Sequence, residues 1–193
     1  MSAALFESVL GNHCSPVLMG LKPSNLVSFS KEKCPEVPEY AAHYTDKLKE
    51  EGIRMELICS CRKHHLLLVY RPEMLEAYLS QKEARQILEK AGYPKNGTLD
   101  EMIAHLKQRY AKKQEFPHEI GIFLGYPLED VKGFQKYGGD GCKMCGYWKV
   151  YGDVDTAKML FAQFDRCREF IVNQLQNGYT IDQVVGMKNY CAA

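Results

Sequence analysis

The sequence lacks a strong charge of either sign, a long apolar run and a glycine-rich phosphate motif. It has 25 lysines and arginines against 24 aspartates and glutamates, and the net charge of +1 offers no general attraction to nucleic acid or to an anionic membrane. No apolar run approaches the roughly 20 residues that cross a bilayer. Neither a G-x-G-x-x-G nor a Walker pattern occurs. We therefore expect neither nucleic acid nor a membrane as a partner.

The N-terminal segment also lacks the features of an export signal. "MSAALFESVLGNHCSP" has no basic start and no long apolar core. We therefore expect a cytoplasmic protein, in which thiols stay reduced. The eight cysteines are then candidates for packing, metal binding or thiol chemistry rather than for a disulfide framework.

The pattern of elements predicts an α+β fold. No internal repeat, low-complexity tract or long linker interrupts the 193 residues, which favours a single globular domain over residues 1–193. Apolar spacing predicts helices over residues 3–12, 36–51 and 72–91, a shorter one from Pro127 and a long one from Val154. Capping boxes formed by Thr98 with Glu101 and by Thr180 with Gln183 predict a helix over residues 98–113 and a last short one. Strands are predicted at residues 24–30, as a hairpin within 53–70, and at 146–152. The second strand of the hairpin, Leu66–Tyr70, is apolar throughout, so we expect it to be central in its sheet. The prediction is a single domain, helix-rich, with a small, mainly antiparallel sheet of about four strands.

A Cys-x-x-Cys motif in a glycine-rich loop is the strongest indication of a metal site. Cys142 and Cys145 precede a predicted strand, an arrangement that can present two thiolates to one tetrahedral zinc ion. Two more ligands are required, for which Cys59 and Cys61 are candidates because strand residues two apart face the same side, and Cys61 with His64 or His65 is the alternative. An iron–sulfur cluster would use the same thiolates. A dithiol redox pair and simple packing are the alternatives.

A second constellation indicates nucleophilic catalysis. Cys14 is a candidate nucleophile, and a catalytic thiol needs a base such as His118. Glu119 is a candidate to orient that histidine, with Asp130 or Asp140 in its place as alternatives. The plainer interpretation is that His118 caps a helix and Cys14 packs.

Other residues near these two segments suit substrate binding. Lys22 can bind an anionic group and Asn25 can polarise a carbonyl, while Tyr147 and Trp148 can pack on a flat ligand. These residues predict a cleft formed by residues 13–25 and 116–151.

Three motifs resemble the bacterial family of unknown function DUF3793. They are "HCSPVLMGLKPSNLVSF", "FPHEIGIFLGYPLEDVKGF" and "CGYWKVYGD", in that order, followed by "FDRCREF". The resemblance extends from residue 13 to about residue 170. It implies a bacterial cytosolic protein found mostly in anaerobes, and it implies no activity, cofactor or catalytic residue.

The sequence leaves three classes of function open. The first is a small-molecule-binding protein or thiol-dependent enzyme built on the predicted cleft, which we favour because its residues fall in two separate motifs. The second is a zinc or iron–sulfur accessory protein that uses Cys142 and Cys145. The third is a non-catalytic interaction module with an exposed apolar patch. Neither the ligand nor the oligomeric state follows from the sequence.

Overall fold

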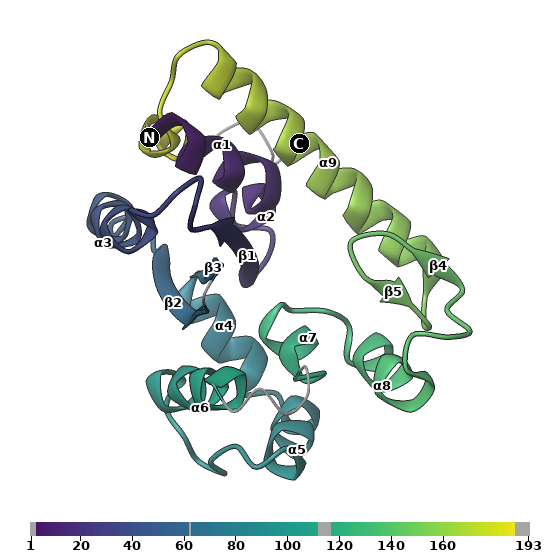
Figure 1. Cartoon of the computed structure of the whole chain (residues 1–193). Coiled ribbons are helices and arrows are strands. Elements are labelled where there is room, and N and C mark those ends of the chain that lie inside the picture. Colours follow the sequence, from purple (N-terminus) through teal and green to yellow (C-terminus); the bar gives the residue numbers. More distant parts are fainter. Residues whose placement is uncertain (1–2, 62, 112–116, 188–193) are drawn as a thin grey trace. The chain divides into compact units, whose positions relative to one another are not determined.

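A computed structural model describes residues 3–61, 63–111 and 117–187 (Figure 1). By its internal contacts the chain divides into two compact units, which we describe separately. Unit 1 comprises Met1–Glu73 and Gln163–Ala193, and unit 2 comprises Met74–Ala162. That the chain is a single domain stays a prediction, whereas the α+β class is confirmed by helices that surround small antiparallel sheets.

A three-stranded antiparallel sheet lies in unit 1. Its strands are β1 (Ser24–Ser30), β2 (Arg54–Ser60) and β3 (His64–Tyr70), in the order β1-β3-β2. The most apolar of the three, β3, is central, as expected for a strand that is buried on both faces. A bulge between Leu57 and Cys59 shifts the register of β2 against β3.

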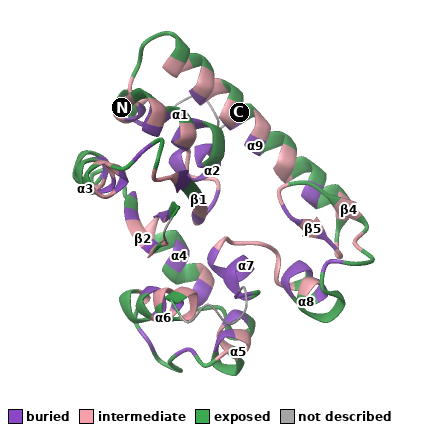
Figure 2. Ribbon diagram, viewed as in Figure 1, coloured by how far each residue is buried: buried purple, intermediate pink, exposed green. Residues whose placement is uncertain are grey.

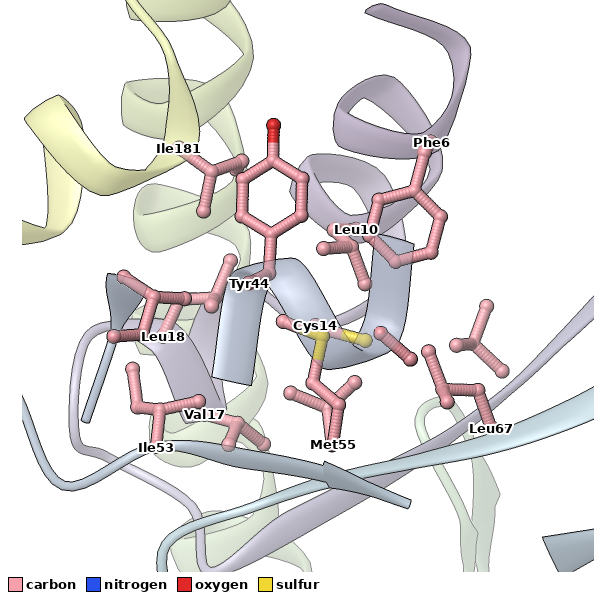
Figure 3. Packing of buried hydrophobic residues seen from close by; sticks show 14 of the residues in the cluster. Phe6, Leu10, Cys14, Val17, Leu18, Tyr44, Ile53, Met55, Leu67 and Ile181 are labelled. Atoms are coloured by element: carbon pink, nitrogen blue, oxygen red, sulfur yellow. The ribbon is translucent and has the colours of Figure 1, made fainter. Parts of the chain in front are cut away.

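Helices cover one face of this sheet. They are α1 (Ala3–His13), α2 (Ser15–Leu18), α3 (Val37–Lys47), the later part of α9 (Val154–Gln176) and α10 (Ile181–Gly186). Their apolar stripes meet alternate strand residues such as Val27 and Leu67, which are partners across the β1–β3 pair. Figure 3 shows this core at close range, with Phe6 and Leu10 from α1 beside Tyr44 from α3.

A buried carboxylate joins the first and last helices of unit 1. Glu7 on α1 accepts hydrogen bonds from the Tyr44 hydroxyl at 2.6 Å and from the Ile181 backbone N–H at 2.9 Å. The second bond satisfies an N–H at the start of α10 that has no partner within that helix. The capping box predicted for α10 from Thr180 and Gln183 is also confirmed.

Unit 2 is mostly helical and ends in a short hairpin. It contains most of α4 (Pro72–Leu79), then α5 (Lys82–Lys90), α6 (Leu99–Ala111), α7 (Ile120–Phe123) and α8 (Leu128–Tyr137), followed by β4 (Met144–Cys145), β5 (Lys149–Val150) and the start of α9. Figure 2 shows that each of the helices α5, α6 and α8 has buried and exposed faces. The capping box predicted at Thr98 and Glu101 opens α6.

Two predicted elements differ from the structure. The helix expected over residues 72–91 is two helices, because Gln81 has an extended ψ of 135° that interrupts the helical hydrogen bonds. The strand expected at residues 146–152 pairs only at Lys149–Val150, because its partner, Met144–Cys145, is itself two residues long. The strands form a three-stranded and a two-stranded antiparallel sheet, which agrees with the prediction of a helix-rich fold with a small, mainly antiparallel sheet.

We expect Glu7→Ala to lower the free energy of unfolding by about 2 kcal/mol, because it leaves the Tyr44 hydroxyl and the Ile181 N–H buried without their acceptor. Urea unfolding measures this difference. The control is Glu50→Ala, which removes an exposed glutamate of the same unit and should change stability by less than about 0.5 kcal/mol. Equal losses in the two variants would show that Glu7 does not join these helices.

Candidate functional site

A pocket of about 240 Å³ lies within unit 2, between the start of α7, the face of α8 and the hairpin strand β5. All of its lining residues belong to unit 2: His118, Ile120, Gly121, Leu124, Tyr126, Asp130, Val131, Phe134, Trp148 and Lys149. Most are aliphatic or aromatic. Three of them are residues that the sequence predicts for a site: His118, Trp148 and, as an alternative partner of the histidine, Asp130.

The turn before α7 places His118 at the pocket. Pro117 is buried, whereas His118 is exposed just before the helix begins at Ile120. The imidazole ring lies 5.4 Å from the ring of Phe134 on α8, at an interplanar angle of 54°. This contact connects the first wall of the pocket to the second.

The carboxylate of Asp130 holds the hairpin against α8. Its Oδ2 accepts a hydrogen bond of 2.7 Å from the indole Nε1 of Trp148. Its Oδ1 accepts bonds from the backbone N–H groups of Tyr151 at 2.7 Å and Gly152 at 2.8 Å. Because Asp130 is only 3% exposed, these donors replace the water that the carboxylate gives up on burial. The sequence analysis names Asp130 as an alternative partner of His118. In the structure its carboxylate accepts these hydrogen bonds from the hairpin segment.

Trp148 is fixed between two aromatic rings. Its ring stacks on Tyr126 at a centroid distance of 5.1 Å and meets Phe161 edge-on at 4.5 Å. The hairpin can approach Phe161 because residue 146 is glycine, and a Cβ at that position would collide with the phenyl ring. The indole is therefore restrained by contacts to its N–H and to its ring.

Two tyrosine hydroxyls support the same wall. Tyr78 donates to the backbone carbonyl of Tyr126, and Tyr126 donates to the carbonyl of Tyr147 at 3.3 Å. Burial raises the pKa of Tyr126 to about 12, and burial together with nearby Asp130 and Glu83 does the same for Tyr78. Both hydroxyls therefore stay protonated as donors at neutral pH.

Lys149 contributes a positive charge among the pocket's lining residues. Its side chain is half-buried, and its Nζ donates to the carbonyl of Gly139 at 2.6 Å. A second lysine of the hairpin segment, Lys143, similarly donates to the carbonyl of Gly152 at 2.8 Å. Lys143 is exposed and is not among the pocket's lining residues.

Two of the residues predicted for this segment have contacts away from the pocket lining. Glu119 is 3% exposed and accepts bonds from Arg109 Nε at 2.8 Å and from the Tyr93 hydroxyl at 3.2 Å. Tyr147 packs its ring 5.4 Å from that of Phe161. These contacts give both side chains a structural role. The function predicted for each stays a prediction.

The site residues predicted near the N-terminus belong to unit 1. Cys14 lies fully buried in the apolar core of that unit (Figure 3), where burial raises the pKa of its thiol to about 12 although nearby Lys22 lowers it. Lys22 is 4% exposed and donates to the Asn25 side chain, which in turn donates to the carbonyl of His13. Burial lowers the pKa of Lys22 to about 8. The structure thus brings Cys14, Lys22 and Asn25 together in unit 1.

The four cysteines predicted as metal ligands fall in both units. Cys142 is half-buried and Cys145 is exposed, both in the β4–β5 hairpin segment of unit 2. Cys59 and Cys61 lie in and just beyond β2 of unit 1, where the Cys61 sulfur accepts a bond from the His64 N–H at 3.3 Å. In the described part of the chain, no three histidine, cysteine or acidic side chains gather as a metal site would require. A metal or cluster site stays a prediction.

Sequence reasoning missed most of the pocket lining. Lys149 lies in the motif "CGYWKVYGD", whose aromatic residues indicate a packed strand and give no sign that this lysine lines a pocket. Val131 and Phe134 are three residues apart on α8 and so share one helical face, which is a signal for packing as much as for a pocket. The pocket lining can therefore be identified only from the tertiary structure, which brings α7, α8 and the hairpin together.

The site and fold together define a helix-rich α+β protein with a small aromatic pocket in one of its units. The family model described as "Protein of unknown function (DUF3793)" matches residues 10–185, and the chain belongs to this family. No curated protein and no solved structure matches the chain. No helix among residues 3–61, 63–111 and 117–187 is long and apolar enough to cross a membrane.

We expect Asp130→Asn to lower the free energy of unfolding by about 2 to 3 kcal/mol, because one amide oxygen cannot accept all the bonds that the two carboxylate oxygens accept. The indole N–H resonance of Trp148, the only tryptophan, should also shift in an ¹⁵N NMR spectrum. Asp140→Asn is the matched control, since Asp140 is exposed in the same unit. An unshifted resonance in Asp130→Asn would contradict the bond.

We expect Lys22 to raise the stability of the protein between about pH 8 and pH 9. Because the pKa of Lys22 falls from 10.5 to about 8 on folding, the unfolded chain binds more protons in this window. The gain amounts to roughly 1 kcal/mol, and above pH 9 the raised pKa of the buried Cys14 thiol opposes any further rise. Urea unfolding across this range should show the rise in wild type and in Lys33→Met, an exposed-lysine control, but not in Lys22→Met. A rise that persists in Lys22→Met would rule out this lysine as its source.

Proposed function

We propose that unit 2 binds a small, flat, largely apolar molecule in the pocket between α7, α8 and β5. The observation that carries the proposal is the pocket itself, whose walls are aliphatic and aromatic side chains with few polar groups. Ligand pockets have this composition, because apolar walls supply affinity while a few polar groups set orientation. An apolar cavity of about 150 Å³ accommodates benzene, so a volume of about 240 Å³ suits a two-ring molecule.

Of the two functions that the sequence predicts for a cleft, we propose the binding of a small molecule and not thiol-dependent catalysis. A nucleophilic cysteine needs a thiolate near neutral pH and access for its substrate. Cys14 has 0% exposure and a raised pKa, so its environment favours the protonated thiol and a packing role. His118, in contrast, is exposed and lines the pocket, where it can contact a ligand directly.

The test uses 2-naphthamide, an uncharged two-ring probe, titrated into ¹⁵N-labelled protein. The indole N–H signal of Trp148 is the reporter, since the chain has one tryptophan and its ring lines the pocket. We expect saturable shifts with a dissociation constant on the order of 0.1 mM, as for a fragment of this size. A signal that does not move up to the solubility limit of the probe would refute the proposal.

Variants distinguish the pocket from other surfaces. Leu124→Phe enlarges a half-buried lining residue and should weaken probe binding at least fivefold, and Val131→Phe, in a more buried wall, provides a second test. The control is Met159→Phe, which changes an exposed residue of unit 2 that does not line the pocket. Equal affinity in all three would place the probe elsewhere.

A further inference from the structure

We infer that the ligand of this pocket is an aromatic carboxylate, whose rings fill the apolar walls and whose acid group is held by Lys149. This inference rests on the proposed function and adds the charge of the ligand to it. It follows from the lining residues with charged or ionisable side chains, which are His118, Asp130 and Lys149.

Lys149 is the lining residue suited to an anion. An ammonium group has three N–H donors, and the bond to the Gly139 carbonyl uses one of them. That bond restrains the amine of a residue that lines the pocket, so less side-chain freedom remains to be lost when a ligand binds. Since Lys149 is half-buried, a charge-assisted bond to a carboxylate there is screened less than one on the open surface.

Asp130 is poorly placed to hold a cationic ligand. Its carboxylate is almost fully buried, and its two oxygens accept the bonds from Trp148, Tyr151 and Gly152 that hold the hairpin on α8. A ligand ammonium would compete with these donors and loosen the wall that it contacts. The same bonds disperse the negative charge of Asp130 toward the hairpin, which reduces its repulsion of an acid in the pocket.

His118 supplies a second polar group to the lining. An imidazole ring carries an N–H donor in either tautomer, which suits a carboxylate. Its packing against Phe134 orients the ring at the pocket. A planar acid is therefore matched by aromatic walls, an ammonium and an imidazole.

Three probes with the same ring system test the charge: 2-naphthoate, 2-naphthamide and 2-naphthylmethylamine. Isothermal titration calorimetry and the Trp148 indole signal report on binding. We expect the acid to bind about tenfold more tightly than the amide, and the amine to bind most weakly. This preference should shrink as salt is raised, because the charges are only partly buried.

Two lysines of the hairpin segment provide a matched pair of variants. Lys149→Met should remove the roughly tenfold preference for the acid over the amide. Lys143→Met removes a charge of the same sign that also bonds a glycine carbonyl but lies outside the pocket lining, so it should keep the preference. Equal losses in both variants would reduce the effect to general electrostatic attraction and overturn the assignment to Lys149.

The outcomes separate this inference from the proposed function. If the acid and the amide bind equally, or the amine binds best, the carboxylate class is wrong while the pocket remains a binding site. If none of the three probes moves the Trp148 signal, the proposed function itself fails. A preference for the acid that is lost only in Lys149→Met supports both.

Discussion

The pocket depends on the need of one buried carboxylate for hydrogen-bond donors. Asp130 sits on α8, and its donors come from the hairpin some 20 residues further along the chain. A buried charge that loses its donors is costly, so the hairpin and the helix are held in one arrangement. That arrangement places Trp148 against Tyr126 and creates the wall that, with α7, encloses the pocket.

Buried carboxylates have the same role elsewhere in the chain. In unit 1, Glu7 joins α1 to α3 and α10 through bonds to Tyr44 and Ile181. In unit 2, Glu119 joins the start of α7 to Arg109 on α6 and to Tyr93. Small sheets and short helices bury little surface each, so specific polar bonds between distant segments help to define how these elements meet.

The pocket and the cysteines point to different kinds of chemistry. The walls between α7, α8 and β5 have the largely aliphatic and aromatic composition of a small-molecule site. Cys14 is instead part of an apolar core, beside a lysine whose own charge is disfavoured by burial. The function that we propose for this cysteine-rich chain therefore uses aromatic rings, a histidine and a lysine.

The sequence by itself determined the α+β class, the central position of β3, and the capping boxes that open α6 and α10, because these follow from apolar periodicity and from bonds between residues close in the chain. It also pointed to His118 and Trp148. Only the tertiary structure decided that these two residues line one pocket, that Asp130 bonds to the hairpin and that Cys14 is buried. Each of these depends on which distant segments pack together, and local patterns carry no information about that choice.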